Sequence, residues 1–195
     1  MTYPDEPVAR IAPLPAEQLT PEQVAILERI PGKGLKGDGF PRNVLGVLMR
    51  NEDTLGPFLD YWVTSKSKLG LTVREQELVI LRMAVHYRSD YVWKHHVKVG
   101  REFGIVDDEM DALRAGAYAA IASPRERALL EAVDACMDRR SIPADLWRAL
   151  RATLSERDLV DTIALVSQYV LFALANVCCQ VQVEDAVAGL PGIEG

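Results

Sequence analysis

The stretch from Leu78 to Val85, LVILRMAV, constrains the fold more than any other part of the chain. A helix through it is apolar around nearly its whole circumference, so other helices must enclose it on every side. Nowhere does the chain alternate apolar and polar residues with the period of a strand. The sequence therefore predicts an all-α fold, a helical bundle with this segment near its centre.

Apolar periodicity and helix-ending residues divide the rest of the chain into further helices. Capping boxes are expected at Thr72, at Ser123 and, in weaker form, at Thr54. Gly104 and Gly116 stand where helices should end. Helices are predicted over 21–29, 43–50, 54–66, 72–87, 90–103, 107–114, 123–139, 143–153 and 155–183.

The chain divides into an N-terminal arm, residues 1–40, and an all-helical domain, residues 41–195. The arm is rich in proline and glycine and is predicted to be extended around one short helix. Such an arm could wrap around a neighbouring subunit of an oligomer. The alternative is that it is disordered. Within the domain, LTVREQELV at 71–79 and LSERDLV at 154–160 are alike. A duplicated helical unit explains this likeness, and so does chance between two capped helices.

Charge and composition argue against several classes of function. The formal net charge is −6, and no basic stripe offsets it, so neither nucleic acid nor an anionic membrane is an expected partner. The N-terminus lacks the basic start and apolar run of a signal peptide, which favours a cytoplasmic protein. Residues 159–183 are long enough to span a bilayer, but polar residues interrupt them, so a buried bundle helix is expected.

The three cysteines argue against a disulfide framework. Their number is odd, and the adjacent pair Cys178 and Cys179 cannot readily bridge to each other. Together with Cys136 they are interpreted as reduced thiols. The adjacent pair lies on an apolar helix, where buried, inert thiols are expected.

Acid–base residues gather around the central helix. Glu77 stands at its start, where a carboxylate facing a dry interior could donate or accept a proton near neutral pH. All the histidines, His86, His95 and His96, lie just beyond it. An antiparallel hairpin of helices 72–87 and 90–103 can bring His96 against Glu77. The alternative for Glu77 is an ordinary first-turn pair with Arg74.

The same residues could be metal ligands, but their spacing argues against it. Adjacent histidines on a helix diverge by about 100° and rarely chelate one ion. We therefore expect neither a metal nor another cofactor.

The pattern L-T-x-R-E-x-E-L-V-I-L-R-x-A at 71–84, followed by Y-x-W-x-x-H at 91–96, resembles the carboxymuconolactone decarboxylase and alkylhydroperoxidase D-like superfamily. The flanks FPRNVLGVLMRN, SPRERALLEAVD and LSERDLV resemble its longer members more loosely. The resemblance implies the superfamily's helical bundle and a homo-oligomer: a dimer, trimer or hexamer.

The spacing of this chain departs from the peroxidase branch of that superfamily. The branch has a Cys-x-x-Cys pair between its glutamate and its histidine. Counted from Glu77, those positions hold Ser89 and Val92, and the histidine position holds His96. A thiol peroxidase needs a thiolate and a resolving partner, so that activity is disfavoured. The lactone decarboxylase branch often has a glutamate where this chain has Val92.

The residues that remain predict a cofactor-independent lyase or decarboxylase acting on a small carbonyl, lactone or carboxylate compound, in aromatic or secondary metabolism. His96 is the expected general acid or base, Glu77 its partner, and Tyr91 a hydroxyl donor. Arg82 could bind a substrate carboxylate, or else pair with an acid such as Asp161. A noncatalytic oligomeric binding protein of the same fold is the alternative. Further substrate contacts are predicted from Ser89, Trp93, His95 and His86.

Overall fold

Helix α4, Val73–Tyr87, lies at the centre of the computed structural model, which describes residues 9–30 and 42–194. Residues 78–81 together with Met83 and Ala84 are fully buried. The helix packs most extensively against α5, Asp90–Glu102, and α9, Glu156–Cys179, and then against α7, Pro124–Arg139. This arrangement confirms the prediction that an all-round apolar helix forms the centre of the bundle.

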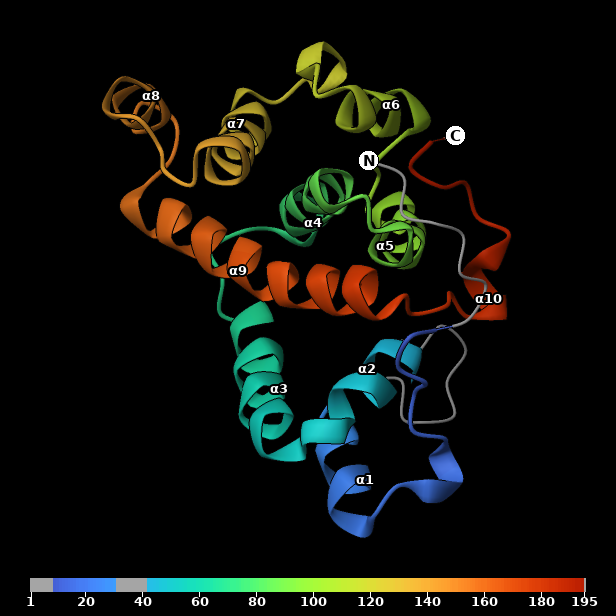
Figure 1. Ribbon diagram of the computed structural model, residues 1–195. Coiled ribbons are helices and arrows are strands. Elements are labelled where there is room, and N and C mark those ends of the chain that lie inside the picture. The colour runs from blue at the N-terminus through green and yellow to red at the C-terminus, as the bar shows by residue number, and fades with distance from the viewer. Residues whose placement is uncertain (1–8, 31–41, 195) are drawn as a thin grey trace.

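The described residues contain helices and no strand, so the predicted all-α class is correct. Helix α9 runs across the whole molecule, with α4 and α5 on one side and α2 and α3 on the other (Figure 1). Helices α6 and α7 cover the remaining side of α4. The other helices are α1 Pro21–Leu27, α2 Arg42–Leu48, α3 Glu52–Lys66, α6 Asp107–Ala115, α8 Ala144–Leu150 and α10 Asp185–Ala188, with short 3-10 turns at Ala16–Gln18, Met49–Asn51 and Tyr118–Ala120.

A tight turn joins α4 to α5 and fixes them as an antiparallel hairpin. Arg88 ends α4 in the left-handed conformation, with φ of 49°, and the Ser89 hydroxyl accepts a hydrogen bond from the amide of Val92 to begin α5. Gly100 lets the two helices approach closely, because a Cβ there would lie 3.2 Å from Leu81 Cδ1. The hairpin therefore holds the polar residues of α5 in a fixed position against α4.

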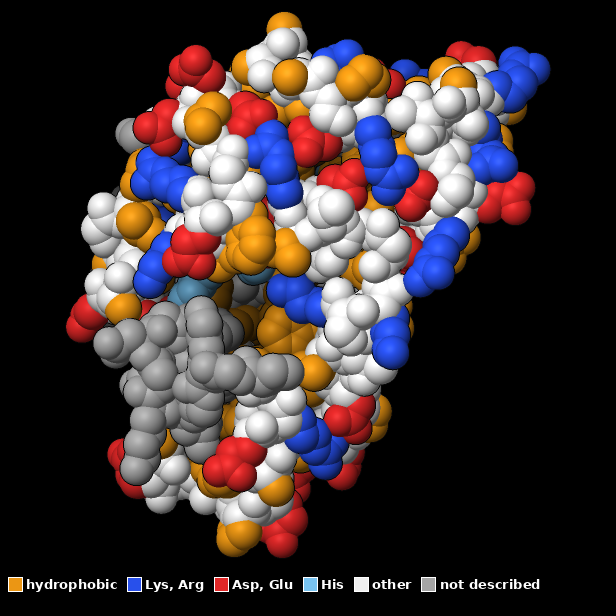
Figure 2. Space-filling view, turned by 180° about the vertical axis from the view of Figure 1, so that it is seen from behind, with side chains coloured by type: hydrophobic (Ala, Val, Ile, Leu, Met, Phe, Trp, Pro, Cys, Tyr) orange, Lys and Arg blue, Asp and Glu red, His pale blue; other side chains and the backbone are white. Residues whose placement is uncertain are grey.

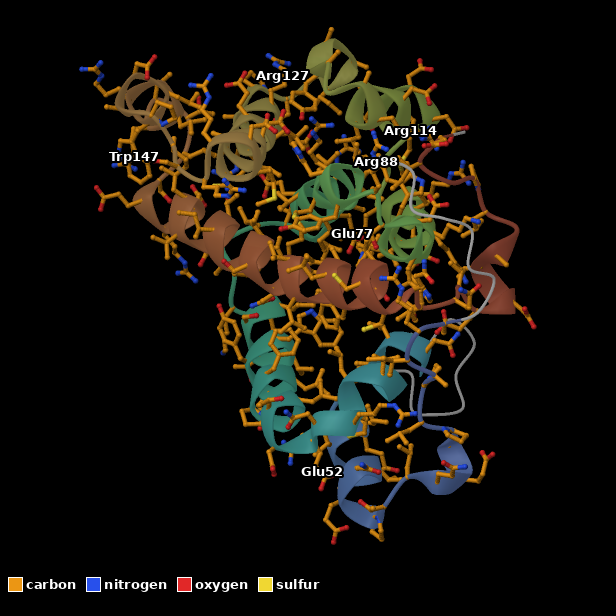
Figure 3. The ribbon with its side chains drawn as sticks, in the orientation of Figure 1. Glu52, Glu77, Arg88, Arg114, Arg127 and Trp147 are labelled. Carbon is orange, nitrogen blue, oxygen red and sulfur yellow. The ribbon has the colours of Figure 1, made fainter. Side chains whose placement is uncertain are left out.

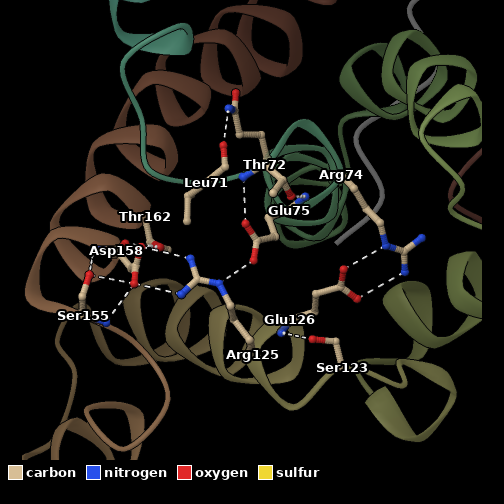
Figure 4. A network of polar contacts seen from close by, with 11 residues as sticks. Leu71, Thr72, Arg74, Glu75, Ser123, Arg125, Glu126, Ser155, Asp158 and Thr162 are labelled. Carbon is tan, nitrogen blue, oxygen red and sulfur yellow. Dashed lines mark hydrogen bonds and ion pairs between the residues drawn. The ribbon is translucent and has the colours of Figure 1, made fainter.

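The N-termini of α4 and α9 are built alike and are tied together by one arginine (Figure 4). Thr72 and Glu75 form a capping box on α4, and Ser155 and Asp158 form one on α9. Arg125 of α7 donates to Glu75 Oε1 at 2.6 Å and to both oxygens of Asp158 at 2.9 and 3.0 Å. Each capping carboxylate thus caps its own helix and joins it to α7.

Several predicted helix ends and caps differ from the structure. Thr54 caps no helix, because α3 already begins at Glu52. The Ser123 hydroxyl accepts from the amide of Glu126, but the Glu126 carboxylate binds Arg74, so the expected capping box is only half formed. Predicted helix 143–153 is shorter, at Ala144–Leu150.

The largest boundary error concerns helix 155–183. Helix α9 ends at Cys179, where Gln180 adopts a left-handed φ of 51° and the amide of Val181 bonds to the carbonyl of Asn176. The chain then turns into α10, which was not predicted.

Helix α9 is long and apolar enough to span a membrane by length and composition alone, and no other helix in the described residues is. Its inward residues Leu159, Leu165 and Ala173 are fully buried. Because it contacts α2, α4, α5 and α7, it serves as a core helix of this bundle.

The described part of the N-terminal arm packs on its own chain. The amide of Arg10 bonds to the carbonyl of Cys179, and that of Leu14 bonds to the carbonyl of Gly46. Ile26 and Leu27 of α1 belong to the hydrophobic core. The rest of the predicted arm, 1–8 and 31–40, lies outside the described residues.

We predict that Arg125→Ala lowers the free energy of unfolding by about 2 kcal/mol, because it leaves two largely buried carboxylates without their cation. Urea denaturation at pH 7 measures the effect. Arg101→Ala is the matched control, since Arg101 pairs with Asp107 in solvent and should change stability by less than about 0.5 kcal/mol.

The Arg125 guanidinium also holds the pKa of Asp158 well below its usual range. A lowered pKa stabilises the fold above the unfolded-state value, about 3.9, and this contribution is lost as the pH falls further. The stability difference between wild type and Arg125→Ala should therefore shrink below about pH 4. A difference that is constant down to pH 2 would contradict the role of this pair.

Candidate active site

A cavity of about 490 Å³ lies where α2 and α3 meet α4, α5 and α9. Figure 2 shows the molecule from behind, with a hollow beside a histidine and orange hydrophobic side chains within it. The volume suits a small organic ligand. The described residues that line it are mostly apolar: Ile30, Val44, Leu45, Trp62, Val63, Val92, Val99, Tyr169 and Phe172, with Lys66, Ser67, Glu77, Tyr91, His95, His96 and Asn176 as the more polar members.

Glu77 and His96 meet in the wall of this cavity. Glu77 lies in the middle of the molecule, between α4, α5 and α9, whereas Glu52 and Trp147 lie near its edges (Figure 3). Its Oε2 is 2.6 Å from Nδ1 of His96, and the side chains are 2% and 16% exposed. Arg74 binds Glu109 and Glu126 instead, so the alternative pairing of Glu77 with Arg74 is wrong.

This contact decides which nitrogen of His96 is available for chemistry. A carboxylate that accepts from Nδ1–H holds the neutral imidazole in the tautomer whose Nε2 carries a lone pair. Among the described residues Nε2 has no partner, and the His96 ring packs edge-on against Tyr169 with centroids 5.1 Å apart. The arrangement can take a proton from a molecule in the cavity and return it.

A second polar group lies at the edge of the cavity formed by α5. Glu184 accepts from Tyr91 at 2.7 Å and from the amide of Asn43 at 2.8 Å, and it contacts His95 Nε2 at 2.7 Å. Burial alone would raise the pKa of Glu184, but these hydrogen bonds outweigh burial and lower it. The group joins the segment after α9 to α5 and α2.

The hydroxyl of Tyr91 is therefore not free to donate a hydrogen bond to a ligand. Burial and the Glu184 carboxylate raise its pKa, so the phenol keeps its proton. That proton is already donated to Glu184, and the oxygen accepts from the amide of Val44. Tyr91 lines the cavity, but its hydroxyl is already hydrogen-bonded within the protein.

Two predicted substrate contacts on α5 lie outside the cavity. Ser89 is buried as the N-cap of its helix. Trp93 is fully buried on another face of the helix, where the Arg114 guanidinium lies 4.7 Å from its ring. Residues on successive helical positions point in different directions, so neighbours of His96 in sequence need not share its cavity.

Arg82 and His86 on α4 also lie away from the cavity. Both bind Asp134 of α7, Arg82 Nε at 2.6 Å and His86 Nε2 at 2.7 Å. The alternative for Arg82, an ion pair with a carboxylate of the bundle, is confirmed, but its partner is Asp134 rather than Asp161, which accepts from the amide of Gly70. Arg82 is thus held in a structural ion pair that joins α4 to α7.

The cysteines lie elsewhere, and none is among the described residues that line the cavity. Cys178 is exposed and Cys179 half-buried at the end of α9, so the prediction of two buried thiols is wrong for Cys178. Burial raises the pKa of Cys136 and of Cys179, which opposes thiolate formation. No group of three or more potential metal ligands is brought together within the described ranges.

The sequence reasoning missed Lys66, Tyr169 and Glu184, which come from helices and segments far from the hairpin. The sequence shows these three residues as polar positions in or after apolar helices. It does not indicate which way their side chains point. Glu184 in particular follows an unpredicted turn at Gln180.

A sequence model of the carboxymuconolactone decarboxylase family matches residues 57–135, which run from α3 into α7 and include Glu77 and His96. Over these residues the chain is similar to the carboxymuconolactone decarboxylase family. No protein of curated function matches the sequence.

Several solved structures share this fold. The debrominase Bmp8 without ligand has a TM-score of 0.73 at 15% identity, covering 90% of this chain and 92% of that one. A peroxidase-related protein of Ralstonia eutropha JMP134 with an AhpD core has a TM-score of 0.69 at 21% identity, over 90% and 93%. One from Silicibacter sp. TM1040 has 0.67 at 19%, over 97% and 98%. At these identities the likeness establishes the fold alone.

Proposed function

We propose that this protein is a member of the carboxymuconolactone decarboxylase-like superfamily and a cofactor-independent lyase or decarboxylase that acts by acid–base chemistry on a small carbonyl, lactone or carboxylate compound. The observation that carries the proposal is the 2.6 Å contact between Glu77 and His96 in the wall of a mostly apolar cavity. A buried carboxylate that orients an imidazole is an arrangement suited to general acid–base catalysis.

The chemistry needs only proton transfer. Cleavage of the bond between a carboxylate and a carbon next to a carbonyl releases carbon dioxide and leaves the electron pair as an enolate. His96 takes up a proton from solvent on Nε2, delivers it to that carbon, and returns to the neutral tautomer whose Nε2 carries a lone pair. Glu77 stabilises the imidazolium while it exists, and the apolar walls strengthen this electrostatic interaction.

Two other functions fit the fold less well. A thiol peroxidase would need a reactive cysteine in the cavity, and the positions that could supply the pair hold Ser89 and Val92. A noncatalytic binding protein would use the same cavity but would not need the pairing of Glu77 with His96. Bmp8, a debrominase of this fold, has also been solved with 2,3,4-tribromopyrrole, which supports a small organic ligand for such a bundle.

We predict that Glu77→Gln and His96→Gln each lower kcat by about 10²–10⁴-fold, the usual contribution of a positioned acid or base. Release of carbon dioxide from a panel of β-keto acids and carboxylated lactones measures turnover. Glu102→Gln, a change on the exposed side of α5, should keep wild-type turnover.

Melting temperatures of all three variants separate catalysis from folding. Unchanged turnover in well-folded Glu77→Gln and His96→Gln would reject the acid–base mechanism. Wild-type protein that binds members of the panel but turns over none would favour the noncatalytic alternative.

We further propose that copies of the chain associate through the outer face of α9. Val160, Ile163, Leu171 and Leu174 are exposed there, and their spacing places them on one side of the helix. Exposed apolar residues gathered on one side of a helix are typical of a protein interface.

Wild-type protein is then expected to be a homo-oligomer, and the double variant Ile163→Asp with Leu171→Asp a monomer, because two charges would have to be buried in the interface. Size-exclusion chromatography with light scattering measures the mass. Val106→Asp, at an equally exposed apolar position on another face, is the control. A monomeric wild type, or an unchanged mass in the double variant, would refute the interface.

A further inference from the structure

Lys66, the last residue of α3, places an unpaired cation at the cavity. Its Nζ lies 5.4 Å from the centroid of the Trp62 ring, and both residues line the cavity. No carboxylate among the described residues lies within ion-pair distance of this ammonium. Arg74 and Arg82, by contrast, each bind an acidic partner.

The surroundings keep Lys66 charged. The Tyr169 oxygen and the Glu77 carboxylate raise the pKa of the Lys66 ammonium, and together they outweigh burial, which would lower it. A charge held among apolar walls is costly unless a group of opposite sign joins it. The cavity therefore favours a ligand that carries a negative charge.

Two hydrogen-bond donors next to Lys66 also lack partners. The indole Nε1 of Trp62 and the hydroxyl of Tyr169 are buried and make no well-formed hydrogen bond within the described part of the chain, although Trp62 and Lys66 both approach the Tyr169 oxygen. Burial raises the pKa of Tyr169, so its hydroxyl keeps the proton that it could donate. Buried donors nearly always have an acceptor, so this corner of the cavity is short of negatively charged or acceptor groups.

Tyr169 connects this corner to the catalytic pair. Its ring packs against His96, and its electrostatic coupling to Lys66 places the ammonium near its hydroxyl. An anionic group at Lys66 would thus lie beside the same tyrosine as His96. The remaining walls near it, such as Val63 and Phe172, are apolar and suit the body of a small hydrophobic molecule.

We propose that Lys66 binds the carboxylate of a small, otherwise apolar substrate, beside the rings of Trp62 and Tyr169 that line the same cavity. The term substrate rests on the proposed function, whereas the binding of a carboxylate does not. This assigns to Lys66 the role that the sequence suggested for Arg82. The competing explanation is a lysine that merely extends its ammonium into solvent at the rim of the cavity.

Isothermal titration calorimetry of the full chain tests the proposal with benzoate and hexanoate, each compared with its neutral amide. We expect at least one acid to bind wild type about tenfold or more tightly than its amide, a difference of about 1.4 kcal/mol. Lys66→Met, which keeps most of the unbranched side chain and removes its charge, should abolish that preference and leave amide binding unchanged. Lys68→Met, an exposed neighbour, should behave as wild type.

Lys66→Arg preserves the charge and should preserve a measurable preference, which keeps the test decisive if Lys66→Met folds poorly. Equal binding of acids and amides by wild type, or an equal preference in Lys66→Met, would overturn the proposal. Failure of the proposed acid–base mechanism would give a different result, in which Glu77→Gln keeps both its turnover and its preference for acids. The carboxylate site would then stand without the mechanism.

Discussion

The enclosure of α4 is the constraint on which the rest of the structure depends. An all-round apolar helix gains its stability only by burial, so each polar group on it must find a partner inside the bundle. Glu75 is satisfied by its own capping box and by Arg125, and Arg82 is satisfied by Asp134. These pairs join α4 to its neighbours. Glu77 differs from them because its partner, His96, lines a cavity.

The features that could be predicted from the sequence are local ones. The central position of α4 follows from eight consecutive residues, and its capping box from Thr72 and Glu75. The contact of Glu77 with His96 could be expected because a short turn makes the hairpin antiparallel, and helical periodicity then places both residues on the facing sides.

Features that depend on distant segments could not be read in the same way. Arg82 has Asp134 as its partner because α7 packs there, and nothing near Arg82 in the sequence indicates this. Tyr169 reaches the cavity from the middle of α9, and Glu184 reaches His95 only because Gln180 ends that helix early. Ser89, beside the turn, is used as a helix cap, a role that competes with any contact to a ligand.

Together these contacts give the cavity two chemically different regions. At one, an imidazole oriented by a buried carboxylate can move a proton; at the other, Lys66 supplies a positive charge. Tyr91, predicted to donate a hydrogen bond to the substrate, instead donates to Glu184 and serves the structure. Apolar walls between these groups lower the local dielectric and make each interaction with a ligand stronger.

The pairing of Glu77 with His96 is tested most directly by nitrogen-15 NMR of the imidazole at neutral pH, with the His96 signals assigned by their loss in His96→Gln. A protonated Nδ1 and an unprotonated Nε2 are expected, because Glu77 accepts from Nδ1. A proton on Nε2, or the averaged signals of a histidine that exchanges freely between tautomers, would contradict the account.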